Sequence, residues 1–338
     1  MVTSYLRDLG SIRLLVQFGL RHGLTEQQLL SHSGLCREQL GDSLAEIEPT
    51  QEIAVIENLV TLLGDEPLLG MRVGWEYSLT VYGQWSFALL CSSTVEEALE
   101  QALRFLPLTY AFCSITVRRL NGQMAVLFAD PIVPKRIKPF VIQRDMAAAA
   151  KLIKTLLGDE RKIERFMYAG EKPHAPALSL PKDWDLEMEF GSALNALIFD
   201  ATYLAAPMPL ANPLTAAACE RYCSEMIERR SMKQDTAATV RMYLHAYRDD
   251  GMLDLPTLAE KLHMSDRALR RHLQEEGSSF REILGEVRRQ LAADMLSSGN
   301  HSMAHIAATL GYSDQSSFSQ AYKRWHGVAP SAVRYKRE

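Results

Sequence analysis

The sequence has few cysteines, no long uncharged apolar run and only a small excess of negative charge. Its 338 residues include five cysteines and no Cys-x-x-Cys pair, which excludes a secreted disulfide framework. No stretch approaches the roughly 18 uncharged apolar residues of a membrane span. The N-terminal apolar run is interrupted by Arg7, Asp8 and Arg13, unlike a signal peptide. We expect a cytoplasmic protein with no membrane span.

Motifs of common enzyme classes are also absent. The chain has no Gly-x-Ser-x-Gly, Gly-x-Gly-x-x-Gly or P-loop pattern. His301 and His305 are spaced for one helix face, but the glutamate of the His-Glu-x-x-His zinc motif is missing. Cys219 and Cys223 lack a third and fourth ligand nearby. We predict no enzymatic activity, cofactor or metal site, and interpret the cysteines as reduced, mostly buried thiols.

Charge and composition divide the chain at the polar run over residues 229–236. The net charge of −4 separates into −6 for residues 1–235, with 23 Lys and Arg against 29 Asp and Glu, and +2 for residues 236–338, with 14 against 12. The length suits about two domains. We predict a first domain over 1–230, a linker over 231–235 and a second domain over 236–338.

The first domain is predicted to be α+β. A capping-box signature at Thr94 starts a helix expected over 95–106, and another helix is expected over 139–157. The dipeptide Asn121-Gly122 joins two β-rich runs and is the strongest two-residue hairpin signal. The domain therefore includes at least one antiparallel sheet.

The second domain is predicted to be all-helical. Within it a short helix, a tight turn and a capped second helix occur twice, with Ser265 and Ser313 as the two capping residues. This pattern predicts two helix-turn-helix units joined by a long helix. Seven helices are expected, over 236–248, 256–263, 266–276, 279–297, 302–310, 314–326 and after Pro330.

The second helix of each unit presents candidate DNA-binding side chains. In the first unit Arg267, Arg270 and Arg271 lie opposite the core positions, where guanidinium groups reach guanine edges or phosphates. The second unit offers a polar set for reading bases and two cations for phosphates. These are Gln315, Ser316, Ser319 and Gln320, followed by Lys323 and Arg324. The connecting helix spans roughly 28 Å, close to the about 34 Å between successive major-groove faces, so one chain is predicted to read two adjacent grooves.

These segments resemble a known family. The run IAATLGYSDQSSFSQAYKRWHGVAPSAVR closely resembles the second helix-turn-helix and signature region of the AraC/XylS family of bacterial transcription regulators, and LAEKLHMSDRALRRHLQEEG resembles its first unit. The run GQWSFALLCSSTVEEALEQALRF is similar to the arabinose-binding-type sensor domain of one branch. The resemblance implies a sequence-specific binder of promoter DNA whose N-terminal domain senses a small molecule and often dimerises. Many relatives carry Arg where this chain has Gln320, which predicts weaker contacts or a different base for the second unit.

Candidate effector-binding residues lie in the first domain. The aromatic side chains of Tyr82 and Trp85 suit an apolar pocket, and Arg72 or Arg144 suits an anion, although core packing accounts for the same aromatic residues. We hypothesise that the ligand alters dimer geometry or releases the second domain for DNA, and that an activator would also contact RNA polymerase. Two alternatives stay open: a constitutive regulator whose first domain only dimerises, and an enzyme fused to a DNA-binding module.

Overall fold

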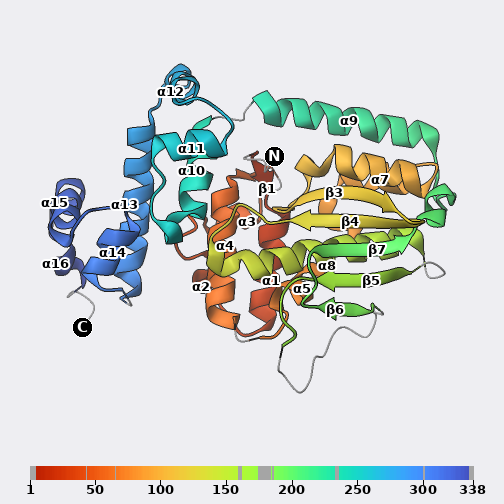
Figure 1. Cartoon of the computed structure of the whole chain (residues 1–338), viewed down its shortest axis with the longest axis horizontal. Coiled ribbons are helices and arrows are strands. Elements are labelled where there is room, and N and C mark those ends of the chain that lie inside the picture. Colours follow the sequence, from red (N-terminus) through yellow and green to blue (C-terminus); the bar gives the residue numbers. More distant parts are fainter. Residues whose placement is uncertain are drawn as a thin grey trace. The chain divides into compact units, whose positions relative to one another are not determined.

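The computed structural model describes residues 5–42, 44–64, 66–158, 162–173, 184, 186–232, 236–299 and 301–334. These residues form two compact units (Figure 1). The first unit contains the described residues up to 131 and from 136 to 232, and the second contains 132–135 and those from 236 onward. The predicted linker covers the last two residues of a helix and residues 233–235, which lie outside the described residues.

A five-stranded mixed sheet organises the first unit. Its spatial order is β3-β4-β7-β5-β6, with one parallel pair, β5 and β6, among antiparallel neighbours. The predicted hairpin is confirmed, because Leu120 pairs with Gln123 across Asn121 and Gly122, whose φ angles of 50° and 82° suit a type I′ turn. The strands are β3 (Ser114–Leu120), β4 (Gln123–Ala129), β5 (Ile163–Tyr168), β6 (Met188–Phe190) and β7 (Asn195–Asp200).

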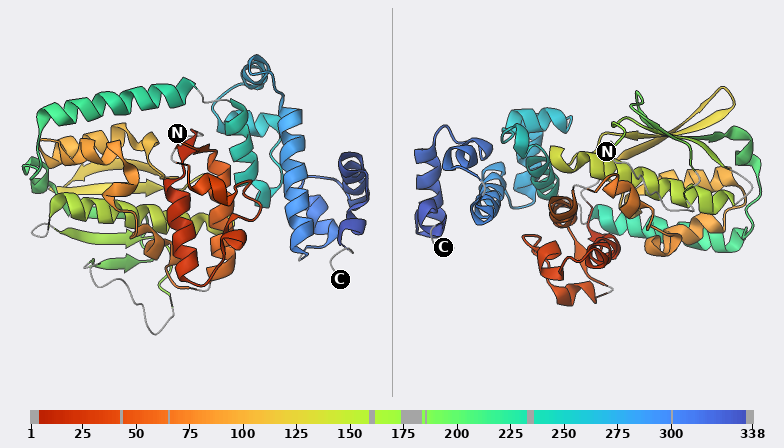
Figure 2. Two further views of the ribbon diagram at one scale, coloured as in Figure 1. Left: turned by 180° about the vertical axis from the view of Figure 1, so that it is seen from behind. Right: turned by 90° about the horizontal axis from the view of Figure 1, so that it is seen from below.

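Among the residues that the structure describes, helices cover one side of this sheet. The second view of Figure 2 shows α7, α8 and α9 on the same side, and the exposed side chains of Thr116 and Arg118 mark the opposite face of β3. A short antiparallel pair, β1 (Arg7–Asp8) and β2 (Glu46–Ile47), lies outside the sheet. The helices are α1 (Gly10–Arg21), α2 (Glu26–Leu30), α3 (Arg37–Leu40), α4 (Pro49–Leu63), α5 (Leu69–Gly74), α6 (Gln84–Leu90), α7 (Val95–Arg104), α8 (Lys138–Leu157) and α9 (Pro213–Met232).

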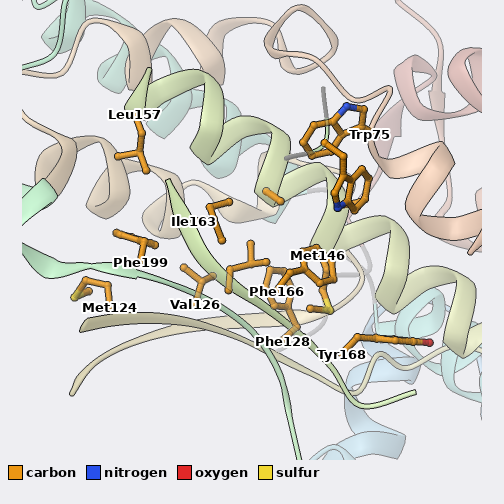
Figure 3. Packing of buried hydrophobic residues seen from close by; sticks show 14 of the residues in the cluster. Trp75, Met124, Val126, Phe128, Met146, Leu157, Ile163, Phe166, Tyr168 and Phe199 are labelled. Carbon is orange, nitrogen blue, oxygen red and sulfur yellow. The ribbon is translucent and has the colours of Figure 1, made fainter. Parts of the chain in front are cut away.

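The core of the first unit lies between the sheet and α8. Alternate residues of β4, Met124, Val126 and Phe128, are buried and share one cluster with Met146 of α8 and Phe166 of β5. Figure 3 shows these side chains converging between the helix and the strands. This alternation is what a sheet with one buried face requires, and it explains the strand periodicity of the sequence.

The second unit is entirely helical in its described residues from 236 onward, apart from turns. A short helix, a turn and a second helix occur twice, as α11–α12 and α14–α15, and the 19-residue helix α13 joins them. Buried side chains from both pairs and from α13 form one core, including Leu258, Leu269, Val287, Ile306 and Phe318. The helices are α10 (Thr236–Ala246), α11 (Leu255–Lys261), α12 (Asp266–Glu275), α13 (Phe280–Ser298), α14 (Met303–Thr309), α15 (Gln315–His326) and α16 (Pro330–Arg334).

Two helix caps differ from the caps that the sequence predicted. Helix α15 is capped by Asp314, whose Oδ1 accepts a hydrogen bond from Ser317 N at 2.7 Å, so the assignment of the cap to Ser313 was wrong. At the start of α7, Thr94 Oγ1 accepts from Glu97 N as predicted, but Glu97 Oε2 accepts from Ser93 N instead of closing the box on Thr94.

Candidate nucleic-acid interface and ligand cavity

Helix α12 presents its arginines on the side opposite the core. The turn before it places His263 at a φ of +55°, and Ser265 Oγ then accepts from Ala268 N at 3.2 Å, which caps the helix. Leu269 and Leu273 are 0 % and 1 % exposed and anchor the helix to the core. Arg267, Arg270 and Arg271 are all exposed. The local sequence thus produces a helix with a buried apolar face and a cationic outer face.

The three arginines differ in their surroundings. Arg271 forms an ion pair with Glu275 one turn later, with Nε 3.6 Å from Oε1. Both side chains are mostly exposed, so this pair contributes little to stability. No ion pair or hydrogen bond joins the side chain of Arg267 or Arg270 to another part of the chain that the structure describes. Two cations of α12 are therefore available to an external anion.

Helix α15 carries the second candidate set. Phe318 and Tyr322 are 0 % and 4 % exposed and fix the helix to the core. The polar residues recur at helical spacing on another face. Gln315, Ser316 and Gln320 are exposed, Ser319 is half-buried, and the two cations, Lys323 and Arg324, are exposed in the last turn. This face offers amide and hydroxyl groups for hydrogen bonds and positive charge beside them.

Arg288, which no sequence pattern indicated as a functional residue, fixes the turn before α15. Arg288 of α13 donates from Nε to Leu310 O at 2.7 Å and from Nη2 to Gly311 O at 3.2 Å. Its guanidinium also lies 4.8 Å from the ring centroid of Tyr312. These contacts join residues more than twenty positions apart, and no local motif announces them. Arg288 therefore holds the turn between α14 and α15 against the connecting helix.

The first unit contains an apolar cavity of about 110 Å³ between α6, α7, α8 and the sheet. Its floor includes Ile115 of β3, Val126 of β4 and Phe199 of β7. Helices α7 and α8 contribute small side chains to the lining, and these alanines leave the space open. The alanines are Ala98 and Ala102 of α7, and Ala148 and Ala149 of α8.

Three of the four predicted effector residues line this cavity: Tyr82, Trp85 and Arg144. Arg72 is not among the lining residues and instead forms an ion pair with Glu66. The structure therefore brings together the aromatic pair, whose ring centroids are 5.1 Å apart, and one of the two candidate cations.

The guanidinium of Arg144 is already occupied by protein acceptors. Nη1 donates to Glu52 Oε1 at 2.9 Å, Nε and Nη2 donate to Asp145 Oδ1 at 3.0 and 2.8 Å, and Nη2 also donates to Tyr110 O at 2.8 Å. Its side chain is 1 % exposed. Two carboxylates of the protein, those of Glu52 and Asp145, take the place of the ligand anion that Arg144 was predicted to face.

Neither a metal site nor a membrane-spanning helix occurs among the described residues. No group of three or more His, Cys, Asp or Glu suited to a metal ion occurs in the described part of the chain. Within the same part, no helix is long and apolar enough to cross a bilayer. Burial raises the pKa of the Cys223 thiol to about 11, so this side chain is an uncharged component of the core.

Both the N-terminal and the C-terminal part of the chain match known protein families. Residues 23–208 match the family described as the arabinose-binding domain of AraC transcription regulators, N-terminal, and residues 258–336 match a helix-turn-helix domain. The uncharacterized HTH-type transcriptional regulator Rv1395 of Mycobacterium tuberculosis is 31% identical over 327 residues, which cover 94% of this chain and 93% of the relative. The ornithine utilization regulator of Pseudomonas aeruginosa is 28% identical over 269 residues, covering 80% and 79%.

A solved structure is also similar. The transcriptional regulator CdpR of Pseudomonas aeruginosa is 23% identical, with 96% of this chain and 98% of that chain covered and a TM-score of 0.49. The matched domains and the named relatives define this chain as a DNA-binding transcriptional regulator and not an enzyme. It belongs to the AraC family, in the branch with an arabinose-binding-type N-terminal domain.

Proposed function

We propose that this regulator responds to a small-molecule effector and reads promoter DNA with two helix-turn-helix units, α11–α12 and α14–α15. The observation that carries the DNA assignment is the outer face of α12, where Arg267 and Arg270 are exposed and unpaired within the described residues. In this proposal Arg267, Arg270 and Arg271 contact one groove. Gln315, Ser316, Ser319 and Gln320 read bases in the next groove, and Lys323 and Arg324 contact phosphates.

The effector response is proposed to pass through α9. Trp85, Leu89 and Leu152 line the cavity and also belong to the buried cluster that contains Cys223 of α9. Arg230, in the last turn of α9, donates to Pro107 O at 2.9 Å. Because α9 leads directly into the predicted linker, a ligand that moves α6 or α8 would shift the helix that precedes the DNA-binding domain.

Domain boundaries and partners follow from the same proposal. We propose an effector and dimerisation domain over 1–230, a linker over 231–235 and a DNA-binding domain over 236–338, acting in the bacterial cytoplasm. The protein would act as a homodimer and, as an activator, would contact RNA polymerase.

Limited proteolysis is expected to cut near 229–236 and release a C-terminal fragment that retains specific DNA binding. A fragment without specific binding contradicts this organisation.

The DNA assignment is tested by Arg270→Ala in the full-length protein. Operator sequences are first selected from a random DNA pool with the wild-type chain. The variant is expected to lose about 1 to 3 kcal/mol of binding free energy on the selected site if Arg270 contacts a base, and little on random DNA. Equal losses on both would assign Arg270 to a phosphate. Arg37→Ala removes an exposed cation from the first unit and should leave both affinities unchanged.

The alternative, a constitutive regulator whose first domain only dimerises, makes a different prediction. A metabolite library screened by thermal shift would then contain no ligand, and operator affinity would not depend on any compound. The responsive regulator requires at least one compound that both raises Tm and changes operator affinity.

A further inference from the structure

We infer that the cavity between α6, α7 and α8 selects an uncharged, mainly apolar effector that offers one hydrogen-bond acceptor, such as an aryl or alkyl ketone. This inference rests on the proposed function, because it takes the cavity as the effector site. It names the chemical class of the ligand, which the arabinose-binding description of the domain would not suggest.

The walls of the cavity are aliphatic over most of their area. Besides the four alanines and the floor formed by the sheet, the lining consists mainly of leucine and isoleucine side chains. These are Leu89 of α6, Leu99 and Leu103 of α7, and Leu152, Ile153 and Leu156 of α8. A sugar would bring several hydroxyl groups to walls that offer few hydrogen-bond partners, and each buried unpaired hydroxyl costs free energy. The lining therefore disfavours polyols.

Charge in the wall is balanced within the protein. Arg144 and Asp145 are the charged residues of the lining, and they bond to each other. The second carboxylate oxygen of Asp145 accepts from Phe112 N and Cys113 N, both at 2.8 Å, and Glu52 binds the remaining side of Arg144. A ligand carboxylate or ammonium group would be desolvated without a free counter-charge. Amino acids and organic acids are therefore disfavoured.

One donor in the wall lacks a partner. Trp85 is 5 % exposed, and its Nε1 is buried without a hydrogen bond to any described residue. Tyr82 lies beside it, and burial raises the pKa of Tyr82 well above its usual value, so the phenol keeps its proton. Two lining residues thus carry neutral donors, the indole N–H of Trp85 and the phenol O–H of Tyr82, and a ligand with a single carbonyl or hydroxyl oxygen would supply an acceptor for them.

The size of the cavity sets the size of the ligand. Its volume of about 110 Å³ is near the roughly 150 Å³ that admits benzene in an engineered apolar cavity. A molecule with one ring or a short alkyl chain fits this space. The probe that combines this size, one acceptor and no charge is acetophenone.

The test compares four probes on the full-length protein by isothermal titration calorimetry: acetophenone, ethylbenzene without an acceptor, benzoate with a charge, and L-arabinose. We expect acetophenone to bind most tightly and ethylbenzene about tenfold more weakly, the factor for one missing hydrogen bond. Benzoate and arabinose are expected not to bind. Tighter binding of benzoate or arabinose, or no binding of acetophenone, overturns the inference.

Two variants locate the binding. Trp85→Phe keeps an aromatic side chain and removes the N–H together with the five-membered ring, so the ratio of acetophenone affinity to ethylbenzene affinity should fall about tenfold. Ala102→Leu fills the cavity from a half-buried position of α7 and should abolish binding of both, with Tm showing that the variant is folded. Retained binding in Ala102→Leu would place the ligand elsewhere and overturn the inference.

Operator affinity separates this inference from the proposed function. Acetophenone binding that follows the expected order but leaves operator affinity unchanged would contradict ligand-responsive regulation and leave the selectivity of the cavity intact. Conversely, a charged or polyhydroxylated compound that changes operator affinity and is blocked by Ala102→Leu would support the regulator and contradict the neutral effector.

Discussion

Glu52 of α4 and Arg144 of α8 form a buried ion pair, with Oε1 2.9 Å from Nη1 and exposed side-chain fractions of 0 % and 1 %. The other carboxylate oxygen of Glu52 accepts from Arg7 at 3.0 Å, and the Ser11 hydroxyl donates to Oε1 at 2.6 Å. One carboxylate thus joins the N-terminal strand, α1, α4 and α8. Because Arg144 also lines the cavity, this network fixes one wall of the proposed effector site.

Glu52→Gln is expected to destabilise the first unit by about 3 to 5 kcal/mol, the usual cost of breaking a buried ion pair from one side. The substitution is nearly isosteric, but it leaves Arg7 and Arg144 buried without their shared negative charge. The free energy of unfolding from urea denaturation measures the effect. Glu76→Gln is the matched control, because Glu76 pairs with Arg21 at the surface and should cost no more than about 1 kcal/mol. Similar losses for the two variants would contradict the argument.

This network also marks the limit of prediction from the sequence. One of the two carboxylates that bind Arg144, that of Glu52, lies 92 positions earlier in the chain, and no local pattern connects Glu52 with Arg144. The same holds for Arg288 and the carbonyl oxygen of Leu310, 22 positions apart. Long-range polar contacts depend on how the elements pack, so the sequence indicated Arg72 or Arg144 as a candidate cation but not the carboxylates that bind them.

Local sequence patterns predicted turns and helix lengths far better than they predicted these long-range contacts. The hairpin at Asn121 and Gly122 was predicted because a two-residue turn requires positive φ, and both residues adopt it. The connecting helix was predicted with 19 residues over 279–297, and α13 has that length over Phe280–Ser298. Ser313 and Asp314 are adjacent and both suit a cap, and here the prediction of Ser313 was wrong, because Asp314 caps the helix.

The corrected cap leads to a prediction for α15. Asp314→Ala is expected to destabilise the second unit by about 1 kcal/mol, because Ser317 N loses its acceptor. Ser313→Ala removes only a hydroxyl that donates to Asp314 at 3.0 Å and should cost much less. Thermal unfolding of the two variants side by side measures the difference. A larger loss for Ser313→Ala would restore the original assignment.

The stability of the second unit is expected to depend on pH through His245. Burial, together with the nearby positive charges of Arg248 and Arg241, lowers the pKa of His245 from 6.5 to about 4. The unfolded chain therefore binds a proton between about pH 6.5 and 4 that the folded unit does not, so stability rises with pH across this window. Acidification from pH 7 to 5 should cost about 1 to 2 kcal/mol.

Urea denaturation at a series of pH values measures this dependence, with hydrogen exchange of α10 peptides assigning it to the second unit. His245→Gln cannot take up the proton, so its stability should change less between pH 7 and 5 than that of the wild type. Equal pH slopes for the two proteins would show that His245 does not titrate as described.

Alanine substitutions at Gly285, inside α13, and at Gly299, its C-cap, are expected to change the stability of the second unit in opposite directions because of backbone conformation alone. Gly285 lies inside the helix and Gly299 caps it at a φ of +72°, and a Cβ added at either would meet no atom within 4 Å. Gly285→Ala should therefore stabilise the second unit by about 0.5 to 1 kcal/mol, because alanine has the higher helix propensity. Gly299→Ala should destabilise it by about 1 kcal/mol, because alanine is strained at positive φ.

Gly285→Ala also tests whether the connecting helix acts as a rigid spacer between the two proposed DNA-reading units. A stiff α13 holds α12 and α15 at a fixed separation, so Gly285→Ala should keep or increase operator affinity while it raises the free energy of unfolding. Affinity is measured on the selected operator and stability by urea denaturation of the same samples. A variant that is more stable but binds the operator more weakly would show that the two units need a bend at Gly285 to reach adjacent grooves, and the rigid-spacer argument would then be wrong.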